Sequence, residues 1–132
     1  MDFSLNSEQK ALIEAARRFA QAELPSLATQ VEASTEPVSL AWRRRYGEMG
    51  FLGVNTAAEH GGLGLPLLDA LLVMEEFAKI SVGVAFPVFE CCTGPVRIVD
   101  RFGDAALRER ILPQMVSGDM LIAISMSEPD AG

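Results

Sequence analysis

Apolar residues between positions 12 and 20 recur at helical spacing, so that they share one face of a helix. Asn6 can accept a hydrogen bond from the first turn, and Gln9 stands three residues later, in a capping-box arrangement. We therefore predict a helix over residues 7–23. We expect it to end before Pro25, because proline disfavours a helical residue ahead of it.

Two more helices are predicted on either side of a glycine-rich loop. One covers residues 39–49, where Gly50 can end it in a left-handed conformation. The glycine-rich stretch EHGGLGLP that follows predicts a loop, because glycine readily adopts a positive φ. Pro66 suits the first turn of a helix over residues 67–80. That helix is apolar nearly all round, which predicts a central place in a bundle.

The pattern after residue 80 predicts two last helices. Residues 84–102 form a buried helix that bends between Cys91 and Pro95, because Pro95 deprives the Cys91 carbonyl of its usual partner. Asp104 caps an amphipathic helix that ends near Leu112 and Pro113. The interpretation to this point is a helical bundle.

The period then changes. Residues 120–126, MLIAISM, are short and apolar and predict a buried strand, and residues 127–132, SEPDAG, are turn chemistry. A lone strand cannot form a sheet, so we expect a helical domain over residues 1–118 and the start of a second, truncated domain over 119–132. Without sheet partners, the strand is expected to be disordered or docked on a neighbouring molecule.

Composition narrows the class of protein. The 132 residues include 11 Lys and Arg against 18 Asp and Glu, a net charge of −7, and 49% are hydrophobic. This describes a globular protein, and its acidity argues against nucleic acid as a partner. Adjacent Cys91 and Cys92 do not suit a mutual disulfide, and with His60 they lack the spacing of metal ligands. We expect no metal site.

We also expect no targeting segment in this chain. Its N-terminus lacks the basic and apolar regions of a secretory signal. The longest apolar stretch, residues 82–99, is interrupted by charges and prolines, so that we predict no membrane span. We expect a cytoplasmic location.

Several motifs stand in one order along the chain. They are DFSLNSEQ, EMGFLGV, EHGGLGLPLLDALLVMEEFAKI, FGDAALRERILPQMVSGD and ISMSEPDAG. Together they resemble the N-terminal half of the acyl-CoA dehydrogenase family of flavoproteins. Two departures are Ser127 for a usual threonine and Ala57 for a usual proline. The resemblance implies a mainly α fold, an N-terminal helical bundle that ends in the first strand of a missing β-barrel domain.

The resemblance also implies a reaction. These oxidoreductases remove hydrogen from the α and β carbons of an acyl-CoA thioester in fatty acid metabolism. A carboxylate base in the C-terminal domain takes the proton, and the N5 atom of FAD takes the hydride. No catalytic residue is then expected in this chain, which alone would be inactive. The implied partners are acyl-CoA, an electron-transfer flavoprotein or similar acceptor, and further copies in a homo-oligomer.

Two groups of site residues follow from the resemblance. The flavin's pyrimidine edge would meet Ile124, Met126 and Ser127. Taken without the resemblance, these residues favour a core strand in which Ser127 caps the turn. The acyl pocket would include Phe89, Cys92 and Val96 on the helix over residues 84–102.

Two other functions stay open at this point. The chain is alternatively a helical interaction module that pairs with a separately encoded flavin subunit. It is otherwise part of a family member whose flavin chemistry has turned to oxygenation, because a fold does not fix its reaction.

Overall fold

The computed structural model describes residues 4–34 and 36–130. These residues form helices and no strand, which confirms the predicted mainly α class. The elements in chain order are α1 (Ser7–Ala33), α2 (Leu40–Glu48), the 3-10 turn η1 (Ala58–His60), α3 (Leu67–Ala78), α4 (Val82–Val88), the π turn η2 (Phe89–Thr93), α5 (Val96–Phe102) and α6 (Ala105–Ser117).

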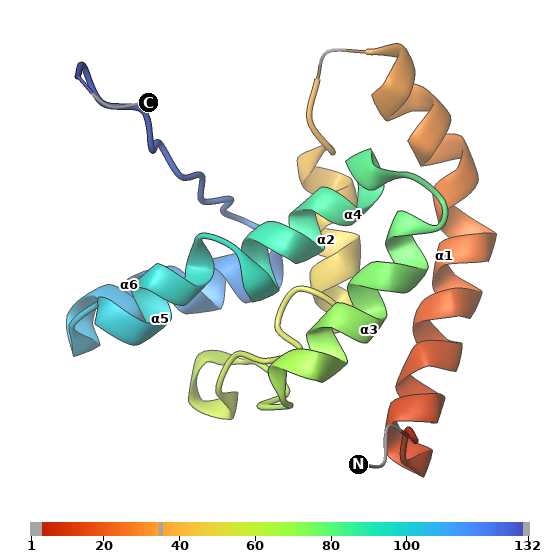
Figure 1. Ribbon diagram of the computed structural model, residues 1–132, viewed down its shortest axis with the longest axis horizontal. Coiled ribbons are helices and arrows are strands. Elements are labelled where there is room, and N and C mark those ends of the chain that lie inside the picture. Colours follow the sequence, from red (N-terminus) through yellow and green to blue (C-terminus); the bar gives the residue numbers. More distant parts are fainter. Residues whose placement is uncertain (1–3, 35, 131–132) are drawn as a thin grey trace.

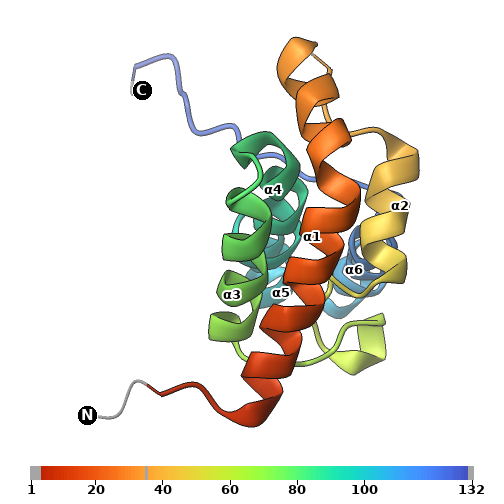
Figure 2. The same cartoon turned by 90° about the vertical axis from the view of Figure 1, so that its right-hand side faces the viewer.

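The helices form a bundle in which α1 lies along one edge and packs against α3 (Figure 1). α1 packs along α3 and α4, while α2 packs against α6, and α5 against α6. Seen from the side, α1 runs between α3 and α4 on one flank and α2 on the other (Figure 2). The C-terminal segment leaves this body as an extended tail (Figures 1 and 2).

Four aromatic rings join the first three helices at the centre of the core. Phe77 of α3 lies 5.6 Å from Phe19, 5.2 Å from Tyr46 and 5.1 Å from Phe51, measured between ring centroids. Phe77 stacks on Phe19 and meets Tyr46 and Phe51 edge to face, and edge-to-face and offset-stacked contacts are the favoured geometries for aromatic pairs. The Tyr46 hydroxyl donates a hydrogen bond of 3.2 Å to the carbonyl of Val84, which ties α4 to this cluster.

The predicted start of α1 is confirmed and its predicted end is wrong. The Asn6 side chain accepts a hydrogen bond from the backbone amide of Gln9 at 2.8 Å, and the Gln9 side chain accepts one from the backbone amide of Asn6 at 3.2 Å. The helix continues through Pro25 to Ala33. Pro25 and the residue whose carbonyl it leaves unbonded, Gln21, both lie on the exposed side, where water can hydrate that carbonyl. Buried side chains beyond Pro25 keep the helix going.

The predicted end of α6 is also wrong. The helix was predicted to end near Leu112 and Pro113, yet it runs to Ser117 with Pro113 inside it. Pro113 is exposed, whereas Leu112 and Met115 are fully buried. The Asp104 cap is as predicted, accepting from the Leu107 amide at 2.7 Å.

The predicted bend between Cys91 and Pro95 is confirmed, and its form is a π turn. η2 lies between α4 and α5, and the Gly94 amide closes it on the Phe89 carbonyl at 2.7 Å. Other predicted features also hold, since α2 and α3 lie where expected and Gly50 has a φ of +79°.

The segment Val82–Phe102 is, by length and composition alone, apolar enough to cross a membrane, with 21 residues and a mean hydropathy of 1.4. Half of it is buried inside the bundle, as for a core helix of a globular domain. The π turn divides it into α4 and α5. The absence of a membrane span stays a prediction.

The predicted strand over residues 120–126 is not formed within the described chain, where residues 120–127 are neither helix nor strand. Met120, Leu121 and Ile122 pack partly against the core. Beyond them the tail is exposed, with Ile124 at 47% and Met126 at 81% of full exposure. Whether this tail pairs in a sheet with another domain stays a prediction.

Candidate functional site

An apolar groove opens along α3, α4 and η2. Its volume is about 290 Å³, and its walls are Met74, Ala78, Val82, Ala85, Phe86 and Phe89. The ring centroids of Phe86 and Phe89 lie 5.5 Å apart with the rings tilted by 50°, and both large apolar side chains are half-exposed. A groove with only hydrocarbon walls can bind an alkyl chain and has no group that would react with it.

The π turn places Phe89 on the groove and its neighbours in the core. Cys91 and Cys92 are fully buried, whereas Phe89 keeps 39% of its surface exposed. Of the three predicted acyl-pocket residues, only Phe89 lines the groove. Cys92 and Val96 lie in the core, so a contact with substrate would require these packed side chains to become accessible.

The two cysteines have no nucleophilic role in this arrangement. The Cys92 thiol points at the carbonyls of Phe51 and Leu52, at 3.5 and 3.4 Å, and burial raises its pKa to about 11. Burial raises the pKa of Cys91 as well. Across the described residues, no group of three His, Cys, Asp or Glu side chains could hold a metal ion.

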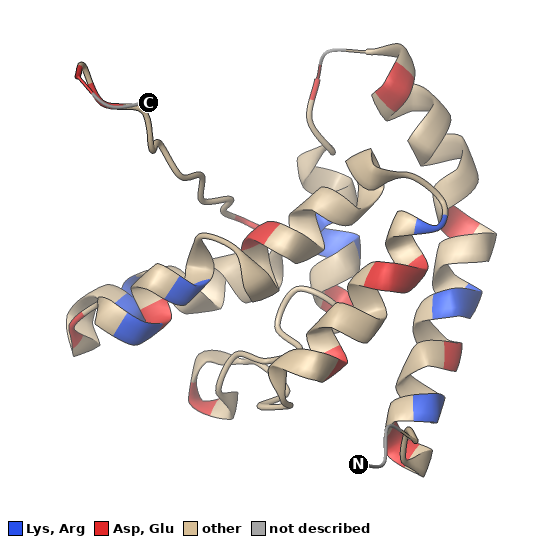
Figure 3. Cartoon of the chain, in the orientation of Figure 1, with Lys and Arg blue, Asp and Glu red and all other residues tan. Residues whose placement is uncertain are grey.

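The predicted flavin-facing residues lie on the tail. Ile124, Met126 and Ser127 are exposed, and Figure 3 shows the tail uncharged between Asp119 and its far end. At its root, Leu121 lines a cavity of about 250 Å³ that also includes Phe86 and Glu90. Phe86 lines both this cavity and the groove, so the root of the tail lies beside the groove.

Glu90 is the one carboxyl group on that cavity's wall. Burial raises its pKa, and the nearby charge of Arg43 opposes that shift. The group lies at the tail's root rather than on the groove itself.

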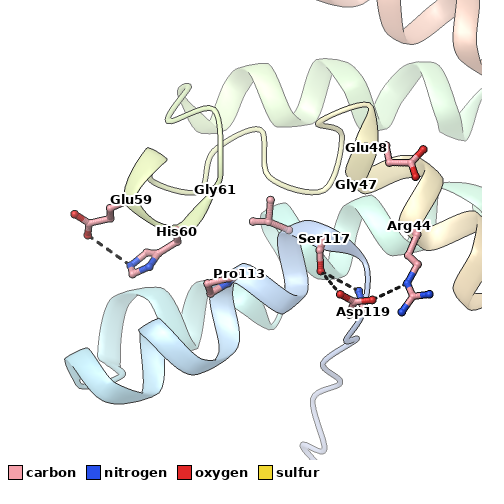
Figure 4. Close-up of a pocket in the computed structure, with 10 residues that line it drawn as sticks. Arg44, Gly47, Glu48, Glu59, His60, Gly61, Pro113, Ser117 and Asp119 are labelled. Atoms are coloured by element: carbon pink, nitrogen blue, oxygen red, sulfur yellow. Dashed lines mark hydrogen bonds and ion pairs between the residues drawn. The ribbon is translucent and has the colours of Figure 1, made fainter.

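A cavity larger than the groove lies against α6. It measures about 590 Å³ and opens between α2, η1 and the end of α6 (Figure 4). A 2.7 Å ion pair between Arg44 and Asp119 flanks it, and the His60 Nε2 atom lies 3.5 Å from a Glu59 carboxylate oxygen. The Arg44 guanidinium lowers the pKa of Asp119.

Sequence reasoning missed two buried carboxylates of α3. Asp69 accepts from the Gln9 side chain at 2.9 Å. Glu76 is only 5% exposed and accepts from the Nε and Nη2 atoms of Arg17 at 3.1 Å each and from Lys79 at 2.7 Å. These hydrogen bonds lower the pKa of Glu76, and the bond from Arg17 has the largest effect. The signal was available, because Asp69, Val73 and Glu76 share one helical face.

Comparison with known proteins gives a consistent result. A family model described as acyl-CoA dehydrogenase, N-terminal domain, matches residues 6–119. The mitochondrial isovaleryl-CoA dehydrogenase of Bos taurus is 34% identical over 130 residues, covering 97% of this chain and 30% of that protein. The benzylmalonyl-CoA dehydrogenase of Aromatoleum aromaticum is 33% identical over 133 residues, covering 100% of this chain and 35% of that protein.

Solved structures share the fold. Butyryl-CoA dehydrogenase from Megasphaera elsdenii superposes with a TM-score of 0.85 at 27% identity, covering 100% of this chain and 35% of that one. The FAD complex of PigA gives a TM-score of 0.84 at 31% identity, with the same two coverages of 100% and 35%. The chain thus spans about a third of the length of these relatives.

Proposed function

Because this chain belongs to the acyl-CoA dehydrogenase family, as its N-terminal helical domain, we propose that it forms one wall of the acyl-CoA site of an FAD-dependent dehydrogenase. The observation that carries this proposal is the groove of α3, α4 and η2, whose lining residues are all apolar. Its place beside the root of the tail brings a hydrocarbon site next to the segment that would meet the flavin.

The groove's contribution is binding by burial. Each methylene of an acyl chain that leaves water for this surface contributes about 0.8 kcal/mol. Val82, Phe86 and Phe89 supply exposed apolar area that an acyl chain would cover. Cys92 and Val96 support the wall from behind, by packing in the core.

The tail's contribution is a rim of hydrogen-bonding groups. The exposed backbone of Ile124 and Met126 and the hydroxyl of Ser127 fit the pyrimidine edge of a flavin, which carries acceptors and a donor. When bound there, FAD would take the β-hydrogen as a hydride. The base that takes the α-proton lies outside this chain in our proposal, since Glu76 and Asp69 are committed to bonds within the bundle.

The wider assignment is part of the same proposal. The whole protein would take an acyl-CoA substrate, pass electrons to an electron-transfer flavoprotein or similar acceptor, act in fatty acid metabolism in the cytoplasm and form a homo-oligomer. Its substrate would be an acyl-CoA thioester, as the names of the similar dehydrogenases indicate for those proteins.

The test compares this chain alone with the chain joined by the domains that follow it in the family. The chain alone should retain no flavin after gel filtration, because each exposed hydrogen bond nets only about 0.5–1.5 kcal/mol and a Kd of 1 μM needs about −8.2 kcal/mol. The joined protein should be yellow, and acyl-CoA should bleach its absorbance. Stoichiometric flavin on the 132-residue chain alone would contradict the proposal.

Two substitutions in the joined protein separate groove from tail. Phe89→Ala should weaken acyl-CoA binding several-fold and leave flavin content unchanged. Phe102→Ala is the matched control, because Phe102 is 78% exposed on α5 and is not among the groove residues. Ser127→Ala should modestly weaken flavin retention. Yellow protein that no acyl-CoA bleaches would favour the oxygenation alternative instead.

A further inference from the structure

We propose that the turn over residues 117–119, fastened to α2, sets the direction in which the flavin-facing tail leaves the helical domain. What the tail meets rests on the proposed function. The fastening itself is a property of the residues described above. We call residues 117–119 together with Arg44 the junction.

Two glycines bring the junction into backbone contact with α2. A Cβ atom on Gly118 would lie 2.4 Å from the carbonyl carbon and oxygen of Arg43, and one on Gly47 would lie 2.5 Å from the Ser117 oxygen. Gly118 also has a φ of +82°, which other residues rarely adopt. The end of α6 therefore has no room to shift against α2.

Asp119 adds directional contacts to this close approach (Figure 4). Its Oδ1 atom accepts from Arg44 Nε at 2.7 Å, and its Oδ2 atom accepts from the Ser117 hydroxyl at 2.8 Å. One carboxylate thus joins α2 to both sides of the turn. The next amide, that of Met120, donates to the Gln114 carbonyl at 3.1 Å, so the chain is held on leaving the turn as well.

These contacts control orientation more than stability. The Arg44 and Asp119 side chains are 57% and 42% exposed, and exposed ion pairs contribute about 0–1 kcal/mol. A rotation at the junction causes a displacement that grows with distance along the tail. Extended chain rises about 3.3 Å per residue, so Ser127 is up to about 26 Å from Asp119. A rotation of about 20° at the junction would displace Ser127 by about 9 Å, far beyond hydrogen-bonding range.

The test measures direction without any flavin. Spin labels are attached in the 132-residue chain to Glu32→Cys on α1 and Ala123→Cys on the tail, which are both exposed sites. Native Cys91 and Cys92 are fully buried and should not react. Pulsed electron resonance should give one narrow distance distribution in this background. Asp119→Ala and, separately, Arg44→Gln should at least double its width while moving the unfolding midpoint little.

The matched control is Asp100→Ala, which removes the 2.6 Å ion pair with Arg97 on α5 and should leave the distribution unchanged. A broad distribution in the background chain overturns the proposal, as does an unchanged width in both junction variants. If the width responds but the joined protein binds no flavin, the junction stands and the proposed function fails. If flavin binds and the width does not respond, only the junction fails.

Discussion

The aromatic centre of the bundle and the C-terminal tail are both apolar in sequence, yet they end in opposite environments. Phe77 is fully buried among three other rings, whereas Met126 is 81% exposed. The rings of Phe19, Tyr46 and Phe51 come from elements that reach Phe77 within this chain. The tail's apolar face has no such cover among the described residues. An apolar sequence thus indicates side chains that need to be buried. The fold determines whether residues of this same chain are placed to bury them.

The largest effect should come from removing the central ring. Phe77→Ala should lower the free energy of unfolding by about 3–5 kcal/mol, because it leaves a cavity among three aromatic neighbours. Met126→Ala is the control and should change it by less than about 0.5 kcal/mol. Urea denaturation followed by circular dichroism measures both. Similar losses in the two variants would show that the tail is packed after all.

A smaller effect is expected at the buried ion pair of the bundle. Glu76→Gln should cost about 1–3 kcal/mol, since the partner Arg17 is half-exposed and can return to water. Glu75→Gln is the control, because that carboxylate is 62% exposed in its pair with Lys79. Equal losses at the two positions would contradict the burial difference.

The same carboxylate gives a pH dependence of known sign. Arg17 lowers the pKa of Glu76, so the folded chain binds this proton less readily than the unfolded chain does. The stabilisation is complete above the ordinary glutamate pKa of about 4.3 and is lost as pH falls through the lower folded value. Stability measured from pH 7 down to pH 3 should therefore fall less steeply in Glu76→Gln than in the unchanged chain.

A finer test concerns a single hydrogen bond of the core. Tyr46→Phe keeps the ring and removes the hydroxyl that donates to Val84, and should cost about 0.5–1.5 kcal/mol. Denaturation of this variant beside Phe77→Ala separates ring packing from hydrogen bonding. A loss as large as that of Phe77→Ala would assign the cluster's stability to the bond between α2 and α4.

The smallest effect should come from the tail. Ile124→Ser should change the stability of this chain by less than about 0.5 kcal/mol, because the residue is 47% exposed. In the protein joined to its following domains, the same substitution should be costly if the tail is then covered. A cost already present in the chain alone would remove the contrast between tail and core.

Most of the bundle could be predicted from spacing and capping. The predicted caps at Asn6 and Asp104 mark real helix starts, and the bend before Pro95 is also real. The wrong predictions lie at Pro25 and Pro113. Each proline was expected to end its helix, yet both helices continue past it because they are packed against the core. Proline in a helix costs about 3 kcal/mol, and the burial of apolar side chains on the following turn outweighs that cost.

The site was less predictable than the fold. Phe89 could be placed on an apolar surface, but spacing alone did not show that Val96 turns inward. The π turn alters the angular register at this point, and no residue type announces it in advance. The bonds of Asp69 and Glu76 join residues about 60 positions apart, with Gln9 and Arg17, so only the tertiary fold reveals them.

The π turn also has a consequence for insertions and deletions. A π turn holds one residue more than the corresponding α turn, so it acts like a one-residue insertion in a continuous helix. Deleting one residue from η2 would break the bond that closes the turn, because the Gly94 amide reaches the Phe89 carbonyl only across five residues. Val96 and Val99 follow the turn and are buried, so a change in its length would displace both side chains in the core. Chain length between Val88 and Val96 should therefore be far less tolerant of change than the identity of any exposed residue there.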